Sequence, residues 1–172
     1  SIYTLSFWIK PESDSFNQKI MVQLQSNSGT AMSQLVNTSG EMKKGEWSKL
    51  TAIIKATGNI ANGRLALLAS VNGAINIDVV SLFPYTWKGR KNGMRSDLAQ
   101  LLADTHPKFI RFPGGCFVEG FDSLVNAFQW KKSIGPIECR PGHRGNWGYR
   151  SSEGLGFDEY LQLCNDMGAA PL

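Results

Sequence analysis

The hydrophobic periodicity of the chain changes at Pro84, and this change restricts the fold more than any other feature. Before Pro84, apolar and polar residues alternate with a period of two, as in strands that bury one face. The alternating sets are Tyr3, Leu5, Phe7 and Ile9; Ile20, Val22 and Leu24; Leu50, Ala52 and Ile54; Leu65, Leu67 and Ala69; and Ile75, Ile77 and Val79. After Pro84 the apolar spacing becomes helical. We therefore expect two domains, at residues 1–83 and 84–172.

The first part is predicted to be an antiparallel β-sandwich. Stretches rich in Gly, Asn and Ser separate the alternating sets, at residues 26–29, 38–40, 58–59 and 72–73. Short strands at this spacing without a helix signal are typical of sandwiches. The alternation slips by one residue after Val79, to Val80 and Leu82, and such a slip predicts a β-bulge.

The second part reads as a parallel α/β segment. The order is a helix at 94–105, a short strand at 108–112, a long loop to 154, a helix from 157 to 167, and the start of a strand at 169–172. Asp158 and Glu159 suit the first turn of the second helix, where the helix dipole favours acids. A (β/α)8 barrel needs eight such units. If this is TIM-type barrel material, the barrel is incomplete, and both chain ends read as cuts through a longer polypeptide.

Composition excludes several classes of function. The net charge is +4, and the 18 Lys and Arg residues are scattered and accompany no nucleic-acid-binding motif. No apolar run approaches the roughly 18 residues of a membrane span. The 3 cysteines lack metal-type spacing, and their odd count argues against a disulfide framework. We expect no metal, no cofactor, no nucleic-acid partner and no membrane partner.

The loop after the strand at 108–112 is the first candidate site, because ligands bind at the carboxyl ends of strands in parallel α/β folds. Gly114 and Gly115 allow positive φ and a close approach of a ligand to the backbone. The alternative is a structural turn without a ligand, which spacing alone favours slightly.

Residues 130–150 form the second candidate site. They lack periodicity but contain Trp130, Trp147 and Tyr149 together with charged residues. A disordered loop is usually poor in aromatic residues. Tryptophan stacks on sugar rings while Arg and Glu bond hydroxyl groups, so this composition suits carbohydrate. A loop packed on its own rings explains the composition equally well.

Long motifs in the second part resemble α-L-arabinofuranosidases of glycoside hydrolase family 51. They are the run at 78–84, RFPGGCFVEG at 111–120, NAFQWK at 126–131, IGPIE at 134–138, RPGH at 140–143, WGY at 147–149 and GLG at 154–156. The first 75 residues match more loosely, through the segments at 46–51 and 61–67, and look like a carbohydrate-binding-module sandwich.

The resemblance implies a retaining hydrolase of terminal α-L-arabinofuranosyl groups on arabinan and arabinoxylan. Retention needs two carboxyl groups about 5 Å apart. In the family these are glutamates on later barrel strands, the first of them after an asparagine, and this sequence contains no Asn-Glu pair. We therefore expect no catalytic residue in this chain and no activity from it alone.

The resemblance also assigns roles to residues of the two candidate sites. The substrate-binding residues are expected to be Gly114, Gly115, Cys116 and Trp147, and the loop-supporting residues Arg111, Glu119, Glu138 and Arg140. One departure is Cys139, because the family has an acidic residue after Glu138. The charge partner of Arg140 is therefore left open.

Two other interpretations compete with a piece of an arabinofuranosidase. One is a non-catalytic carbohydrate-binding protein, and the other is a structural domain whose loop aromatics only pack. The expected partner is an arabinose-containing plant polysaccharide or oligosaccharide. Oligomerisation of a full-length enzyme, the preferred linkage and export stay open, with a bacterial enzyme, exported or cytoplasmic, as the expectation.

Overall fold

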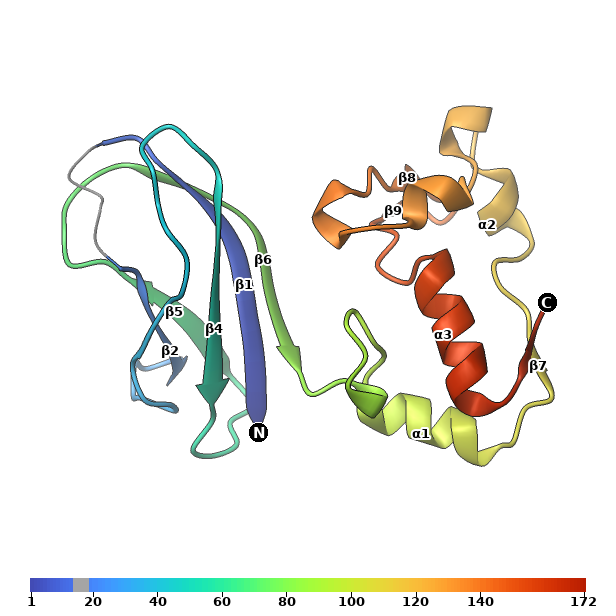
Figure 1. Ribbon diagram of the computed structural model, residues 1–172, viewed down its shortest axis with the longest axis horizontal. Helices are drawn as coiled ribbons and strands as arrows, with labels where there is room; N and C mark the ends of the chain where they lie inside the picture. The colour runs from blue at the N-terminus through green and yellow to red at the C-terminus, as the bar shows by residue number, and fades with distance from the viewer. Residues whose placement is uncertain (14–18) are drawn as a thin grey trace. The chain divides into compact units, whose positions relative to one another are not determined.

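The computed structural model describes residues 1–13 and 19–172, which form two compact units, Ser1–Tyr85 and Thr86–Leu172 (Figure 1). Within the residues described, no helix combines the length and the apolar character needed to cross a bilayer.

The first unit consists of two antiparallel three-stranded sheets. One has the strand order β4-β1-β6 and the other β3-β2-β5. The strands are β1 (Ile2–Pro11), β2 (Met21–Ser26), β3 (Val36–Asn37), β4 (Ser48–Lys55), β5 (Gly63–Leu68) and β6 (Ile75–Pro84). The expectation of antiparallel strands before Pro84 is confirmed.

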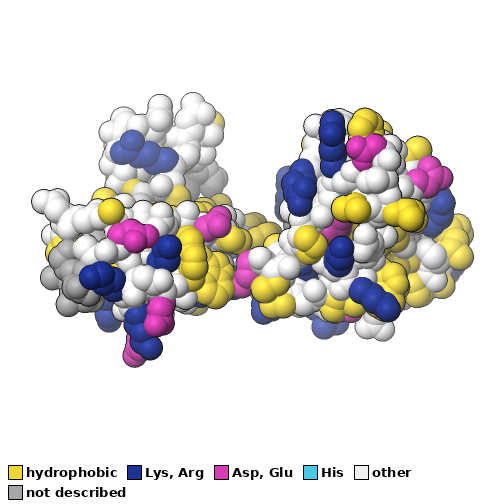
Figure 2. All heavy atoms as spheres, turned by 90° about the horizontal axis from the view of Figure 1, so that it is seen from above, with side chains coloured by type: hydrophobic (Ala, Val, Ile, Leu, Met, Phe, Trp, Pro, Cys, Tyr) yellow, Lys and Arg dark blue, Asp and Glu magenta, His cyan; other side chains and the backbone are white. Residues whose placement is uncertain are grey.

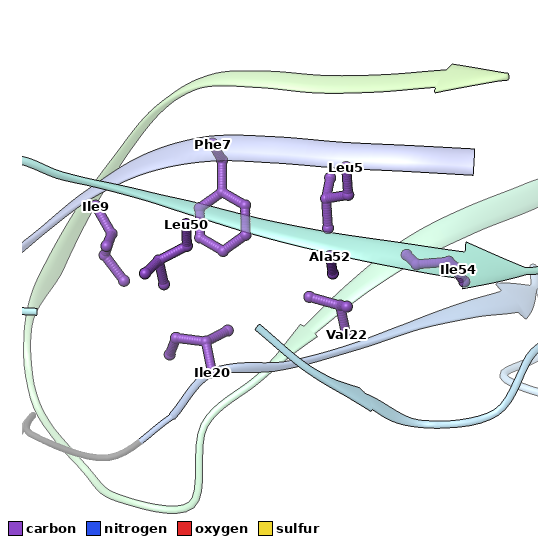
Figure 3. Close-up of a cluster of buried hydrophobic side chains, with 8 residues drawn as sticks. All are labelled: Leu5, Phe7, Ile9, Ile20, Val22, Leu50, Ala52 and Ile54. Atoms are coloured by element: carbon purple, nitrogen blue, oxygen red, sulfur yellow. The ribbon is translucent and has the colours of Figure 1, made fainter. Parts of the chain in front are cut away.

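The core of the first unit lies between these sheets. Leu5, Phe7 and Ile9 on β1 are fully buried. Leu50, Ala52 and Ile54 on β4 point to the same side (Figure 3). Ile20 and Val22, at the start of β2, reach toward them from the opposite sheet (Figure 3). The alternation in the sequence therefore marks the buried face, because successive side chains of a strand point to opposite faces.

The predicted bulge in the last strand is confirmed. The register between β1 and β6 shifts between Ser6, opposite Ser81, and Trp8, opposite Asp78. Val79 lies at the shift with a φ of 48°. The extra residue restores Leu82 to the core side, where it packs against the buried cluster.

The second unit contains short elements around one parallel strand pair. They are η1 (Trp87–Gly89), α1 (Ser96–Asp104), β7 (Phe109–Ile110), α2 (Cys116–Glu119), η2 (Leu124–Asn126), η3 (Trp130–Ser133), η4 (Ile137–Cys139), β8 (His143–Arg144), β9 (Arg150–Ser151), α3 (Phe157–Met167) and β10 (Ala170–Pro171). β7 pairs in parallel with β10. In the described part of the chain no further strand joins this pair.

Both predicted helices of the second unit are present, but they are packed differently. α3 buries Tyr160 and Cys164, and the Tyr160 hydroxyl donates to the carbonyl of Ile110 at 2.6 Å. In α1 the apolar side chains are exposed, and Ala99 is the buried residue of the helix. On the face of the molecule drawn in Figure 2, hydrophobic side chains lie among charged ones.

The segment between β7 and α3 is more ordered than its aperiodic sequence indicates. It folds into α2, three 3-10 turns and the β8–β9 hairpin. Single turns and two-residue strands are too short to produce a hydrophobic period, so the sequence predicts only a loop there.

Candidate functional site

The glycine pair follows β7 and leads into α2. Gly115 has φ 57° and ψ −144°, a conformation that a residue with a β-carbon adopts only under strain. At Gly114 an added β-carbon would lie 2.9 Å from the guanidinium carbon of Arg111. Arg111 therefore lies against the backbone of the glycine pair, and Cys116 follows at the exposed start of α2.

The β8–β9 hairpin carries Trp147 and Tyr149 of the second candidate site, whereas Trp130 lies in η3 and packs against Phe157. Gly145 N donates to Tyr149 O at 2.9 Å and closes the hairpin tip. Trp147 and Tyr149 are 58% and 57% exposed. Their ring centroids are 6.2 Å apart, and the ring planes differ by 17°. The two rings therefore face solvent as a stacked pair and do not pack into the loop.

The glycine-pair loop and the hairpin meet directly. The side-chain amide of Asn146 donates to the carbonyl of Cys116 at 3.3 Å. Phe117 in α2 packs edge-on against His143 of β8, with ring centroids 4.8 Å apart. Trp147 follows Asn146 in the chain, so the structure brings the segments of Cys116 and Trp147 together.

A buried acid–base pair fixes the base of the hairpin. His143 Nδ1 on β8 contacts Glu153 Oε1 after β9 within hydrogen-bonding distance, and both side chains are almost fully buried. The outer atoms, His143 Nε2 and Glu153 Oε2, are buried and have no hydrogen-bond partner among the residues described. Both residues line a cavity of about 180 Å³ between the hairpin and η2. Sequence reasoning did not single out this pair.

Arg140 joins the loop segments to α3. Its guanidinium donates to the carbonyls of Gly135 and Glu153, each at 2.7 Å. It also contacts both carboxylate oxygens of Glu159, at 2.7 and 3.1 Å. The pair is buried, with side-chain exposures of 1% and 8%. Glu159 is therefore the charge partner of Arg140, which the sequence left open because Cys139 stands where an acidic residue was expected. The sequence had indicated Glu159 only as an acid of the first helical turn.

Glu159 acts both as a helix cap and as a buried carboxylate. It accepts a hydrogen bond from Gly156 N at 3.0 Å at the start of α3. Burial raises the pKa of Glu159, but hydrogen bonds from Arg140 and Asn92 and the charge of Arg140 outweigh burial, so its pKa lies below the ordinary value. A β-carbon at Gly156 would lie 2.0 Å from Ser133 O and 2.6 Å from Arg140 Nη1, so only glycine leaves room for this arrangement.

The other glutamates expected to support the loops are placed differently. Glu119 is exposed on α2, and Glu138 is half-buried in η4. The two buried glutamates of this unit, Glu153 and Glu159, are held by His143 and Arg140. The buried carboxylates therefore serve packing and positioning.

Over residues 1–13 and 19–172, no cluster of His, Cys, Asp or Glu side chains is arranged to hold a metal ion. Cys116, Cys139 and Cys164 are free thiols.

Comparisons with known proteins identify the class. A family model described as the α-L-arabinofuranosidase 1 domain matches residues 101–172. α-L-Arabinofuranosidase 1 of Arabidopsis thaliana is 43% identical over 158 residues, which cover 89% of this chain and 23% of the relative. The extracellular exo-α-L-arabinofuranosidase of Streptomyces chartreusis is 38% identical over 181 residues, which cover 99% of this chain and 21% of the relative.

A solved structure shows the same likeness in three dimensions. An arabinose-bound α-L-arabinofuranosidase, MgGH51, superposes with a TM-score of 0.85 at 31% identity, covering 99% of this chain and 28% of that chain. The fold and the relatives place the chain among the glycoside hydrolases. Within that class it belongs to the α-L-arabinofuranosidases of family 51, and it spans between about a fifth and a quarter of the length of the relatives quoted above.

Proposed function

We propose that this chain supplies one wall of the substrate pocket of a retaining α-L-arabinofuranosidase. The pocket takes a terminal arabinofuranosyl group of arabinan or arabinoxylan. Gly114, Gly115 and Cys116 line the sugar ring, and Trp147 contacts the leaving group. The hydrogen bond from Asn146 to Cys116 O carries this proposal, because it brings both predicted wall segments to one place.

In this proposal the second unit is the early part of a (β/α)8 barrel. Support comes from the parallel pairing of β7 with β10, with α3 between them in the chain. The glycine pair then lies at the carboxyl end of a barrel strand, where active sites of such barrels are built. The first unit is a carbohydrate-binding-module-like sandwich.

The reacting carboxylates of this enzyme lie outside residues 1–172. Retention requires a nucleophile and an acid/base about 5 Å apart. Glu159 is held in a buried ion pair with Arg140, and Glu153 is held by His143. The sequence also contains no Asn-Glu pair, so this proposal assigns the reaction to a longer protein that includes these residues.

A matched pair of cysteine substitutions tests the pocket wall. Cys116 and Cys139 are both exposed, so each accepts a larger side chain without disturbing a core. In the full-length protein, Cys116→Phe is expected to lower kcat/KM for nitrophenyl α-L-arabinofuranoside at least about tenfold, a loss of roughly 1.4 kcal/mol in transition-state binding. Cys139→Phe is expected to change it less than about twofold.

The outcomes separate the proposals. Residues 1–172 alone are expected to release no nitrophenol above a buffer blank. If residues 1–172 alone do hydrolyse the substrate, and Glu119→Ala or Glu138→Ala abolishes this activity, the chemistry is wrongly assigned.

The second candidate function is a non-catalytic carbohydrate-binding protein, which the exposed Trp147–Tyr149 pair favours. It gains support if the full-length protein binds arabino-oligosaccharides but hydrolyses none.

A further inference from the structure

The ring of Phe128 contacts three separate parts of the second unit. Its centroid lies 5.9 Å from that of Phe112, which follows β7, and 5.4 Å from that of Phe117 in α2. The third contact is with His143 on β8, at 6.4 Å between ring centroids. Phe112 and Phe117 lie on either side of the glycine pair, and His143 lies at the base of the hairpin. One side chain therefore packs against both parts of the proposed pocket wall.

The backbone around Phe128 is held independently of its ring. The Phe128 amide donates to the carbonyl of Val118 in α2 at 3.1 Å. Gly120, which follows α2 with a φ of 84°, packs against the same segment, because an added β-carbon there would lie 2.5 Å from the carbonyl carbon of Asn126. A substitution that changes only the ring of Phe128 leaves these backbone contacts in place.

The glycine pair depends on its neighbours for its position. Gly114 and Gly115 have no side chains with which to pack, so the loop is placed by the residues that flank it. Phe112 and Phe117 are those flanking residues, and both pack on Phe128. Closely packed groups transmit a displacement to one another, so a change at Phe128 reaches the loop from both sides.

We propose that Phe128 is a positioning residue that sets the spacing between the glycine-pair loop and the Trp147 hairpin. The inference rests on the proposed function, because these two segments are the parts of the pocket wall. Phe128 acts through Phe117 and His143. A displacement of about 1 Å in groups that hold a substrate can lower the rate roughly a hundredfold, so the loss of this spacing is measurable.

A matched pair of substitutions in the full-length protein tests the proposal. Phe128 and Phe157 are both half-buried in the second unit, but Phe157 packs on Trp130 and Tyr160, which lie outside the wall. With nitrophenyl α-L-arabinofuranoside, Phe128→Leu is expected to raise KM about fivefold and to lower kcat/KM about tenfold. Phe157→Leu is expected to change each less than about twofold. Unfolded enzyme lowers the apparent kcat but leaves KM unchanged, so the rise in KM reports the wall itself.

A double-mutant cycle adds a second measurement. Asn146→Ala removes the hydrogen bond from the hairpin to the carbonyl of Cys116. If Phe128 places these two segments against each other, both substitutions disrupt the same arrangement, and their losses in kcat/KM are not independent. The loss in the double variant is expected to be about fivefold smaller than the product of the single losses. Phe157→Leu combined with Asn146→Ala is expected to give the simple product.

The possible results separate the two proposals. An unchanged KM in Phe128→Leu, an equal rise of KM in Phe157→Leu, or losses that multiply in the double variant with Asn146→Ala would each overturn the positioning role of Phe128. A parent protein that does not hydrolyse the nitrophenyl substrate overturns the proposed function instead.

Discussion

At the scale of single residues, the contact between Arg140 and Glu159 holds the second unit together. The two residues are 19 positions apart, and Arg140 also binds the carbonyls of two separate loop segments. Removing one partner leaves the other as an uncompensated buried charge, and such a loss is far more destabilising than the loss of an exposed pair.

Glu159→Gln is therefore expected to lower the free energy of unfolding of the second unit by about 3 kcal/mol. Asp158→Asn is the matched control, because Asp158 is exposed in the same helical turn. We expect it to cost less than about 0.5 kcal/mol. Native-state hydrogen exchange of α3 amides at increasing urea concentrations measures both changes in unfolding free energy. Equal effects of the two variants would show that the charge pair contributes little.

The same pair predicts how stability depends on pH. The pKa of Glu159 is lower in the folded chain than in the unfolded chain. Its contribution is therefore complete above the unfolded value of about 4.3 and is lost as the pH falls through the lower folded pKa. The difference in unfolding free energy between wild type and Glu159→Gln should shrink below about pH 4. The pH-dependent contributions of carboxylates present in both proteins cancel in this difference. A difference that stays constant down to pH 2 would contradict this assignment.

At the scale of elements, β1 is the central strand of the first unit. It pairs with β4 on one side and β6 on the other, and it contributes Leu5, Phe7 and Ile9 to the core. The opposite face of the same sheet carries Ile53, which is 70% exposed. One sheet therefore offers a buried and an exposed apolar position for comparison.

Phe7→Ala is expected to destabilise the first unit by about 3–5 kcal/mol, because it removes a fully buried ring and leaves a cavity. Ile53→Ala should change stability by less than about 0.5 kcal/mol. Hydrogen exchange of β1 and β4 amides reports the first unit, and α3 amides report the second. If both variants lose hydrogen-exchange protection of β1 and β4 amides to a similar extent, the face of the sheet that carries Phe7 is not the core of the first unit.

At the scale of the whole molecule, the second unit leaves an apolar surface uncovered. Leu98 and Leu101 on α1 are 54% and 65% exposed, although the helix is amphipathic and its apolar stripe is suited to cover a sheet. Contiguous exposed apolar surface favours association.

Residues 1–172 are expected to self-associate through this stripe as their concentration rises. Replacing Leu98 and Leu101 by Lys should shift the chain toward monomer in sedimentation velocity. The matched control replaces Leu35 and Ile60, both 47% exposed in the first unit, and adds the same charge. If the control suppresses association equally, net charge and not the α1 stripe controls it.

The sequence predicted those elements whose structure depends on local pattern. The alternation in β1, β2 and β4 marked their buried faces, and the slip after Val79 marked a bulge. The loop elements and the partners of buried charges were not predictable in this way. Arg140 and His143 lie 19 and 10 residues from their carboxylates, and no periodic signal links such distant positions.

By itself the sequence determined the longer strands of the first unit, the helices α1 and α3, and the motifs that place the chain among family 51 arabinofuranosidases, because periodicity and local residue order encode them directly. Only the tertiary structure decided that Glu159 neutralises Arg140, that His143 pairs with Glu153, and that Cys116 meets the Trp147 hairpin. These contacts join segments that are distant in the chain. Their formation depends on burial and packing, which arise only when the whole unit has folded.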